Sequence, residues 1–345
     1  MKNRVFFHIA VFIFLIVSCG QDRTKDTSSA EQPAEKIILK VAHNGSEQHP
    51  FQKGFEVFKQ VLEAESNGLV EVQIFPAGQL ASEEEANQMI KLGTIAASAA
   101  SAGGLGSFVP EADLFNLPFI FRDLPHFYSV LDGPTGRRVA RAIEDRLDCL
   151  VLGYWFSGIR SAWNSIKPIQ TPDDLNGLKI RVIRSPIVLD TFNAFGAQAT
   201  NMSFGELYSA LQQGVLDGAE SDYTDLLVEK FYEVTKYVAK TEHLFLAVAL
   251  IFSKKQYDRL PPYIQTAVLK AGEASVAVQR QAMENMGSKA LVELKQKGLI
   301  FNEVDKKLFQ EKVVDVYKNN AEKVGGMGVI EQVTKQGLND LAQKE

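Results

Sequence analysis

The sequence predicts an α/β fold organised in two domains. Segments with the alternation or apolar runs of strands take turns with segments that have the three- to four-residue spacing of helices. The 309 residues from Ile37 to Glu345 are enough for two ordinary domains. A helical pattern over 262–298 would reach roughly 50 Å at about 1.5 Å per residue, which is too long for one small domain. We therefore expect this helix to span both domains.

The N-terminal residues have the features of an export signal. Lys2 and Arg4 precede an apolar run over 5–17 that is short for a membrane span. The run ends in IVSC, which matches a bacterial lipobox and predicts cleavage before Cys19 and lipid attachment to it. Residues 1–18 are then a lipoprotein signal peptide, and residues 19–36 form a polar, lipid-anchored tether. An ordinary signal peptide or anchor helix with an incidental cysteine remains the alternative.

Charge and composition argue against several classes of function. Without Lys2 and Arg4, 35 basic residues stand against 42 acidic ones with no basic run, so nucleic acid is not an expected partner. Cys149 cannot form an internal disulfide once Cys19 is lipidated, and we expect it to pack at the start of a strand. The sequence has no phosphate loop, nucleophile elbow or paired-histidine zinc helix, so we expect no cofactor and no metal.

The body of the chain is expected to form the following elements in order. Strands are predicted at 39–44, 70–75, 95–101, 149–156, 178–183, 245–253 and 299–304. Helices are predicted at 50–68, 83–93, 126–146 and 262–298, with two more at the C-terminus. The small residues of 95–101 (IAASAAS) would let a ligand or a neighbouring element approach closely.

Residues 176–223 contain the clearest indication of a binding site. The strand LKIRVI places Arg181 near its end, on a partly apolar face. A helix should follow, with Ser185 as its N-cap and Pro186 at its first position.

A second helix is predicted where SFGE (203–206) reads as a capping box, with Phe204 in the first turn. The polar cluster ESDY (220–223) comes shortly after it. A strand-end arginine, an aromatic residue at a helix N-terminus and a polar turn together indicate an anion pocket.

Four sequence blocks match a known family, and they are FPAGQL (75–80), LPFIFRD (117–123), TPDDLNGLKIRV (171–182) and FGAQATNMSFGELYSALQQGVLDGAES (195–221). With these blocks the chain resembles the solute-binding proteins of the tripartite ATP-independent periplasmic (TRAP) transporters, of the DctP type. The resemblance implies a two-lobed α/β clamp, like other periplasmic binding proteins, with a discontinuous chain path. Lobe I would comprise 37–157 plus 247–286, and lobe II 158–246 plus 287–345, with the long helix crossing both.

The implied function is capture of a small organic acid by hinge closure, on the periplasmic or extracytoplasmic face, and its delivery to TRAP membrane subunits. A sugar acid such as a uronate or aldonate is the first choice, because hydroxyl groups would suit the polar residues expected around the mouth. A C4-dicarboxylate or 2-oxo acid is the alternative. A sensor module for a membrane kinase, or a periplasmic enzyme acting on similar acids, is less favoured, because no nucleophile or acid–base pair stands out.

The resemblance also assigns roles to particular residues. Arg181 takes the place of the arginine that forms a two-pronged salt bridge to the ligand carboxylate, and a guanidinium fork suits that task. Arg160 matches a second position near the carboxylate, with a role in shaping the domain junction as the alternative. Phe204 matches an apolar wall residue, with ordinary core packing as the alternative.

Further candidates lie on both sides of the expected cleft. They are Asn44, His49, Glu84 and Ser101, of which His49 and Glu84 could reach hydroxyl groups of the substrate. The turn Ser221, Asp222 and Tyr223 departs from the family, which usually has asparagine at the first of these positions. A serine has one donor where an amide has two. We therefore expect this turn to influence which acid is bound.

Overall fold

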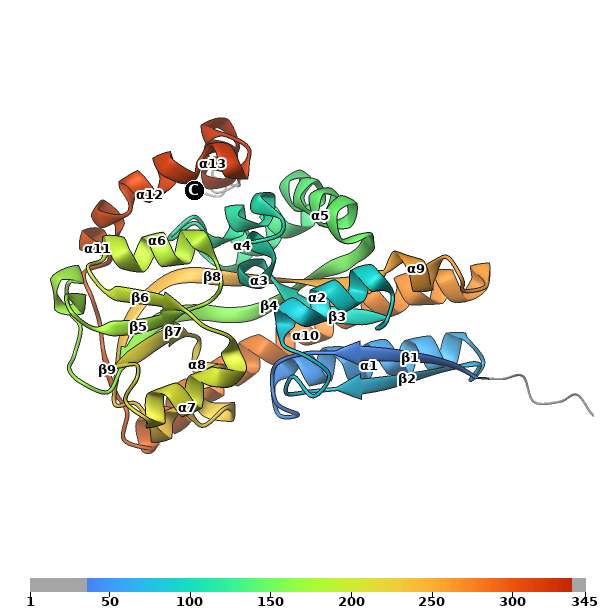
Figure 1. Cartoon of the computed structure of the whole chain (residues 1–345), viewed down its shortest axis with the longest axis horizontal. Helices are drawn as coiled ribbons and strands as arrows, with labels where there is room; N and C mark the ends of the chain where they lie inside the picture. The colour runs from blue at the N-terminus through green and yellow to red at the C-terminus, as the bar shows by residue number, and fades with distance from the viewer. Residues whose placement is uncertain (1–35, 337–345) are drawn as a thin grey trace, which may run out of the picture. The chain divides into compact units, whose positions relative to one another are not determined.

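The computed structural model describes residues 36–336 and contains a mixed nine-stranded sheet (Figure 1). The strand order is β2-β1-β3-β8-β4-β7-β5-β6, with β9 paired to β8. The strands are β1 (Ile37–Ala42), β2 (Val70–Phe75), β3 (Ala97–Ser101), β4 (Cys149–Asn164), β5 (Lys179–Val182), β6 (Gln198–Asn201), β7 (Gly218–Ser221), β8 (Tyr237–Ser253) and β9 (Ile300–Asn302). The predicted α/β class is confirmed.

Helices connect the strands and cover the sheet. They are α1 (Pro50–Glu65), α2 (Glu83–Leu92), α3 (Ala102–Gly106), α4 (Leu124–Asp132), α5 (Pro134–Leu147), α6 (Pro186–Ala194), α7 (Leu207–Gln212), α8 (Tyr223–Val228), α9 (Lys254–Tyr257), α10 (Pro262–Gln296), α11 (Lys306–Lys312), α12 (Val314–Asn320) and α13 (Met327–Lys335). Short 3-10 segments are η1 (Pro110–Asn116), η2 (Pro172–Leu175), η3 (Phe204–Glu206), η4 (Phe231–Glu233) and η5 (Glu322–Val324). None of the helices described has the length and apolar character that a membrane span requires.

Three sequence-based expectations for the helices were wrong. The helix predicted over 126–146 is two helices, because Gly133 is extended and Pro134 begins α5 without a backbone donor. The expected pair of terminal helices is three, α11 to α13. The predicted capping box at Ser203 does not form: the Glu206 N–H already donates to the Ser203 carbonyl at 3.2 Å, which winds η3 instead.

The two longest strands, β4 and β8, run antiparallel through the middle of the sheet and both exceed their predicted lengths. Their register shifts between Phe156 and Ile159. Gly158 lies in this irregular stretch with φ of 83°, and a Cβ there would come within 2.4 Å of the Asp222 Cβ. Glycine is therefore needed where β4 passes the start of α8.

Helix α10 contributes to three clusters of buried residues, two of which lie at its two ends. Its N-terminal part, including Val268, packs with α1, β1 and β2, whereas its C-terminal part, including Leu294, packs with Trp163 and α7. Figure 1 shows α10 running along the sheet between these two regions. The 35-residue helix thus has the length and the bridging position that the sequence predicted.

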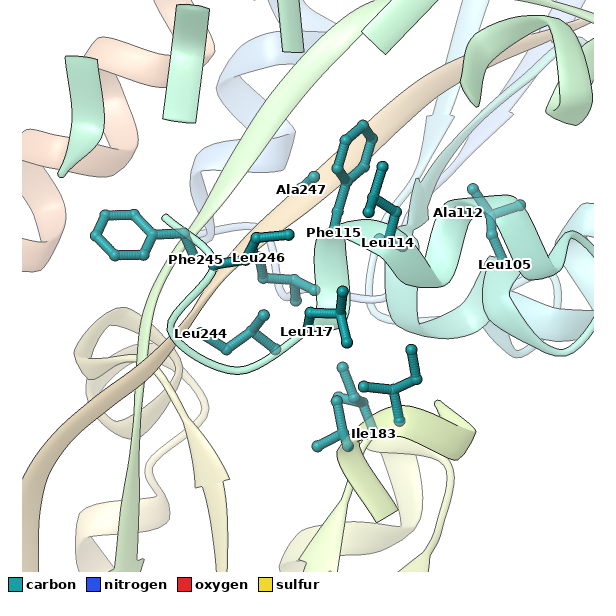
Figure 2. Packing of buried hydrophobic residues seen from close by; sticks show 14 of the residues in the cluster. Leu105, Ala112, Leu114, Phe115, Leu117, Ile183, Leu244, Phe245, Leu246 and Ala247 are labelled. Carbon is teal, nitrogen blue, oxygen red and sulfur yellow. The ribbon is translucent and has the colours of Figure 1, made fainter. Parts of the chain in front are cut away.

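A third cluster lies where η1 meets β8. Figure 2 shows Leu114, Phe115 and Leu117 gathered at Leu244–Ala247 of β8, with Ile183 nearby at the end of β5. This packing fixes the segment that follows β5, and Arg181 with it, against the centre of the sheet.

Gln279 joins α10 to the irregular part of β4. Its buried amide accepts from the Phe156 N–H at 2.9 Å and donates to the Phe156 carbonyl at 2.8 Å. We predict that Gln279→Leu lowers the free energy of unfolding by about 2–5 kcal/mol, because two buried backbone groups lose their partners. Urea denaturation measures this, and Gln281→Leu, at an exposed position of the same helix, should change stability by about 0.5 kcal/mol or less. Equal stability of the two variants would contradict this account of Gln279.

Candidate ligand-binding site

A cavity of about 530 Å³ lies among the ends of β1, β3 and β5, the middle of β4 and the starts of α2 and η3. Its size is in the range of small-molecule sites. Most of the residues predicted from the sequence line it, and these are Asn44, His49, Glu84, Ser101, Arg160, Arg181 and Phe204. Residues from distant parts of the chain are thus brought to one cavity.

Arg181 extends from β5, and only part of its guanidinium group is hydrogen-bonded. Its Nε and Nη2 donate to the Met202 carbonyl at 2.9 and 2.7 Å, whereas the buried Nη1 has no hydrogen-bond partner among the residues described. Burial lowers the pKa of Arg181 to about 10, which still leaves it charged at neutral pH. The side chain is thus a fixed cation at the wall of the cavity, and one of its buried donors has no partner among the described residues.

Arg160, on β4, is buried and forms an ion pair with Glu220 through its Nε and Nη2. Its Nε lies 2.5 Å from Glu220 Oε2, and its Nη2 donates to Glu220 Oε1 at 3.0 Å. Burial alone would raise the pKa of Glu220, but Arg160 and His243 together lower it to about 2. Glu220 Oε1 also accepts from the Ile183 N–H at 3.0 Å, so one carboxylate ties β4, β7 and the end of β5 together.

Glu83 was not singled out by the sequence, yet it lines the cavity beside two predicted residues. Its Oε1 accepts from the Ser101 N–H at 2.6 Å, and its Oε2 accepts from Asn44 Nδ2 at 3.1 Å. Burial raises the pKa of Glu83 to about 7. Ser101 is also the N-cap of α3, where its hydroxyl accepts from the Gly104 N–H at 2.9 Å.

His49 is buried at the N-terminus of α1. Its Nδ1 accepts from the Phe51 N–H at 3.2 Å, so Nε2 carries the proton in the neutral ring. Nε2 faces Asp225 Oδ1 at 3.6 Å, and burial lowers the pKa of His49. His49 is therefore a neutral donor at the cavity wall.

Two further contacts complete the wall. Glu84 pairs with the half-exposed Arg184 at 3.4 Å. The ring centroid of Phe204 lies 6.0 Å from the guanidinium carbon of Arg181, within the range of a cation–π contact.

The turn Ser221, Asp222 and Tyr223 does not line the cavity. Ser221 is buried and its hydroxyl accepts from Trp163 Nε1 at 3.1 Å, while Asp222 caps α8 through the Thr224 N–H at 2.7 Å. The ring of Tyr223 packs against Phe301 with centroids 5.4 Å apart. The polar groups of this turn are thus directed into the protein, where they hold the start of α8.

Sequence reasoning missed Glu83, Arg184 and Asp225, all of which line the cavity. Glu83 follows the capping serine Ser82 of α2 and precedes the predicted Glu84, and its place in the first turn of that helix was the available signal for it. Asp225 stands three residues after the N-cap of α8, and that spacing was the available signal for it.

The remaining sequence predictions concern cysteine and metal. Cys149 is buried at the start of β4, as expected, and its thiol donates to the Ile143 carbonyl at 3.8 Å. Cys19 lies outside the residues described. Within 36–336, no group of three or more histidine, cysteine, aspartate or glutamate side chains could hold a metal ion.

The Arg160–Glu220 pair should make the stability of the protein dependent on pH. We predict that Glu220→Gln costs about 3–5 kcal/mol near neutral pH, because it leaves the buried Arg160 without its counter-charge. The folded-state pKa of Glu220 is depressed from 4.5 to about 2, so its stabilisation is present above pH 4.5 and declines as the pH falls toward 2.

The measurement is the difference in unfolding free energy between wild type and Glu220→Gln from pH 7 to pH 3. The difference should shrink toward acid. Glu303→Gln is the control, because Glu303 is a well-exposed ion-pair partner of Lys240. Its unfolding free energy should differ little from that of the wild type at every pH. A constant difference for Glu220→Gln would show that its charge does not provide the stabilisation.

Comparison with known proteins identifies the family. Residues 41–323 match the family described as bacterial extracellular solute-binding protein, family 7. The C4-dicarboxylate-binding periplasmic protein DctP of Rhodobacter capsulatus is 31% identical over 299 residues, which cover 85% of this chain and 89% of that protein.

Solved structures of TRAP periplasmic solute-binding proteins share the fold. One from Sulfitobacter sp. NAS-14.1, with bound β-D-galacturonate, has a TM-score of 0.82 and 31% identity, covering 87% of this chain and 98% of that chain. One from Chromohalobacter salexigens, with bound D-glucuronate, has a TM-score of 0.81 and 29% identity, covering 89% and 100%. These matches confirm the two-lobed fold and the expectation of a binding protein rather than an enzyme. The chain belongs to the family of bacterial extracellular solute-binding proteins, family 7, the solute-binding proteins of TRAP transporters.

Proposed function

We propose that this protein captures a small organic acid whose carboxylate binds Arg181 in the cavity. The observation that carries the proposal is the buried Arg181 Nη1, which has no partner among the described residues while Nε and Nη2 are held by Met202. A charged donor removed from water gains most from an anionic partner. A carboxylate at Nη1 would supply that partner at the Phe204 side of the cavity.

A sugar acid, such as a uronate or aldonate, is the first choice of ligand. Away from Arg181 the cavity offers polar side chains, among them Asn44, His49 and Glu83, which suit hydroxyl groups. The Sulfitobacter and Chromohalobacter relatives were solved with uronates. The Rhodobacter relative is named for C4-dicarboxylates, so a C4-dicarboxylate or 2-oxo acid is the second candidate.

Capture would proceed by closure of two lobes, with 37–157 plus 247–286 as lobe I and 158–246 plus 287–345 as lobe II. Several contacts join these segments around the cavity. The Ser46 N–H donates to Glu229 Oε1 at 2.8 Å, the Ser185 hydroxyl donates to Asp113 at 2.6 Å, and Glu84 pairs with Arg184. Such contacts would hold the closed form, which would then dock on TRAP membrane subunits.

The N-terminal sequence supports a lipid anchor for this extracytoplasmic protein. The apolar run followed by IVSC predicts cleavage before Cys19 and acylation of that cysteine. The polar residues 20–36 would then act as a tether between the membrane and the folded chain.

We predict that Arg181→Ala weakens binding of the carboxylate ligand by at least about 100-fold, since truncating one partner of a buried charge pair costs 2–5 kcal/mol or more. The ligand is first identified by a thermal-shift screen of sugar acids, C4-dicarboxylates and 2-oxo acids, each compared with a neutral analogue, and affinity is then measured by calorimetry. Lys179→Ala, an exposed position on the same strand, should bind as wild type does. Undiminished affinity of Arg181→Ala would refute the proposal.

We also predict that Cys19→Ala produces a protein that partitions into the aqueous phase of a detergent extraction, whereas the wild type partitions into the detergent phase. The reason is that acylation supplies the hydrophobic anchor, at about 0.8 kcal/mol per buried methylene. Cys149→Ala is the matched control and should leave the partitioning unchanged. If the wild type partitioned into the aqueous phase, this would show that Cys19 carries no lipid.

A further inference from the structure

Asp225 is a buried carboxylate whose charge is poorly compensated at the wall of the cavity. Its side chain is 6% exposed and lines the cavity from the first turn of α8. The nearest basic groups are His49 Nε2 at 3.6 Å and Arg160 Nη1 at 3.8 Å, and both lie beyond hydrogen-bonding distance. No N–H group and no serine, threonine or tyrosine hydroxyl within 36–336 donates to the Asp225 carboxylate, and the hydrogen-bonding side chain beside it is the carboxyl group of Asp222.

The neighbours of Asp225 do not neutralise it. His49 is neutral, and Arg160 is already paired with Glu220 at 2.5 Å. Glu229 is acidic, whereas burial and Asp225 raise the pKa of Asp222 to about 8, so Asp222 carries little charge at neutral pH. Burial first, and then Glu229, raise the pKa of Asp225 to about 7, although Arg160, the hydrogen bond with Asp222 and Arg181 oppose this. A buried acceptor of this kind gains free energy from a hydrogen-bond donor.

Glu83 is the other acidic group deep in the cavity, but its oxygens already accept from the Ser101 N–H and from Asn44. Asp225 is therefore the carboxylate with acceptor capacity to spare.

The cations of the cavity wall limit how many carboxylates it can bind. Three arginines line it, of which Arg160 is paired with Glu220 and Arg184 with Glu84. Arg181 forms no ion pair with any of the described residues. One carboxylate can thus be matched by a free cation, while a second one near Asp225 would meet a like charge.

We propose that Asp225, together with His49, selects a hydroxylated monocarboxylate over a dicarboxylate with the same carbon skeleton. A ligand hydroxyl would donate to Asp225, and a second carboxylate in its place would be repelled. The inference rests on the proposed function, in which Arg181 binds the first carboxylate. His49 and Asp225 belong to different proposed lobes, so this subsite is complete only when the two are closed together.

The test compares two pairs of open-chain acids that differ at one end, L-galactonate with galactarate and D-erythronate with meso-tartrate. Affinities are measured by calorimetry at pH 8, on the mature chain. Wild type should prefer the monocarboxylate in at least one pair. In Asp225→Asn the affinity for the dicarboxylate, relative to that for the monocarboxylate, should rise by at least about 10-fold, because the like charge is removed.

Asp225→Ser provides a second uncharged variant, and its preference should move in the same direction. Glu233→Gln removes one negative charge from an exposed residue outside the cavity, and it should keep the wild-type ratio. Thermal unfolding checks that each variant is folded.

The role of Asp225 would be overturned if the wild type bound neither monocarboxylate or preferred the dicarboxylates. It would also be overturned if both Asp225 variants kept the wild-type ratio of monocarboxylate to dicarboxylate affinity. Arg181→Ala separates these results from a failure of the proposed function. If Arg181→Ala abolishes binding of the acids found by the thermal-shift screen while the Asp225 variants keep the wild-type ratio, only the inference about Asp225 is wrong. If Arg181→Ala binds as wild type does, the proposed function is wrong as well.

Discussion

The buried ion pair between Arg160 and Glu220 is the interaction on which the arrangement of the site depends. Glu220 accepts from Arg160 on β4 and from the Ile183 N–H after β5, and it lies 3.6 Å from His243 on β8. Because these partners come from different strands, the pair fixes β4, β7, β8 and the end of β5 relative to one another. Breaking such a pair is costly, since it leaves an isolated charge in the interior.

The same pair decides which arginine is available to a ligand. Arg160 and Arg181 both line the cavity, but Glu220 compensates the charge of Arg160, whereas Arg181 forms no ion pair within residues 36–336. The Met202 carbonyl holds the Arg181 guanidinium without neutralising its charge. A rigid cation at the wall of a cavity discriminates strongly for anions, because little reorganisation is needed when the ligand arrives.

Local patterns predicted the elements well, and distant contacts account for most of what they missed. Val70–Phe75, the start of α6 at Pro186 and the length of α10 follow from alternation, capping and periodicity. The position of Arg181 was predictable from its strand and its family motif. The roles of Glu83 and Asp225 were not, because they depend on partners such as Asn44 and His49, far away in the sequence. The turn after β7 was expected to contribute to the anion pocket, but it does not line the cavity, and its side chains make contacts within the protein such as that between Ser221 and Trp163.

The most direct test of this account is a crystal structure of the protein with the acid that stabilises it in the thermal-shift screen. The account predicts that the ligand carboxylate lies within hydrogen-bonding distance of Arg181 Nη1, while Arg160 stays paired with Glu220. A ligand carboxylate bound away from Arg181, with Nη1 still lacking an anionic partner, would contradict it.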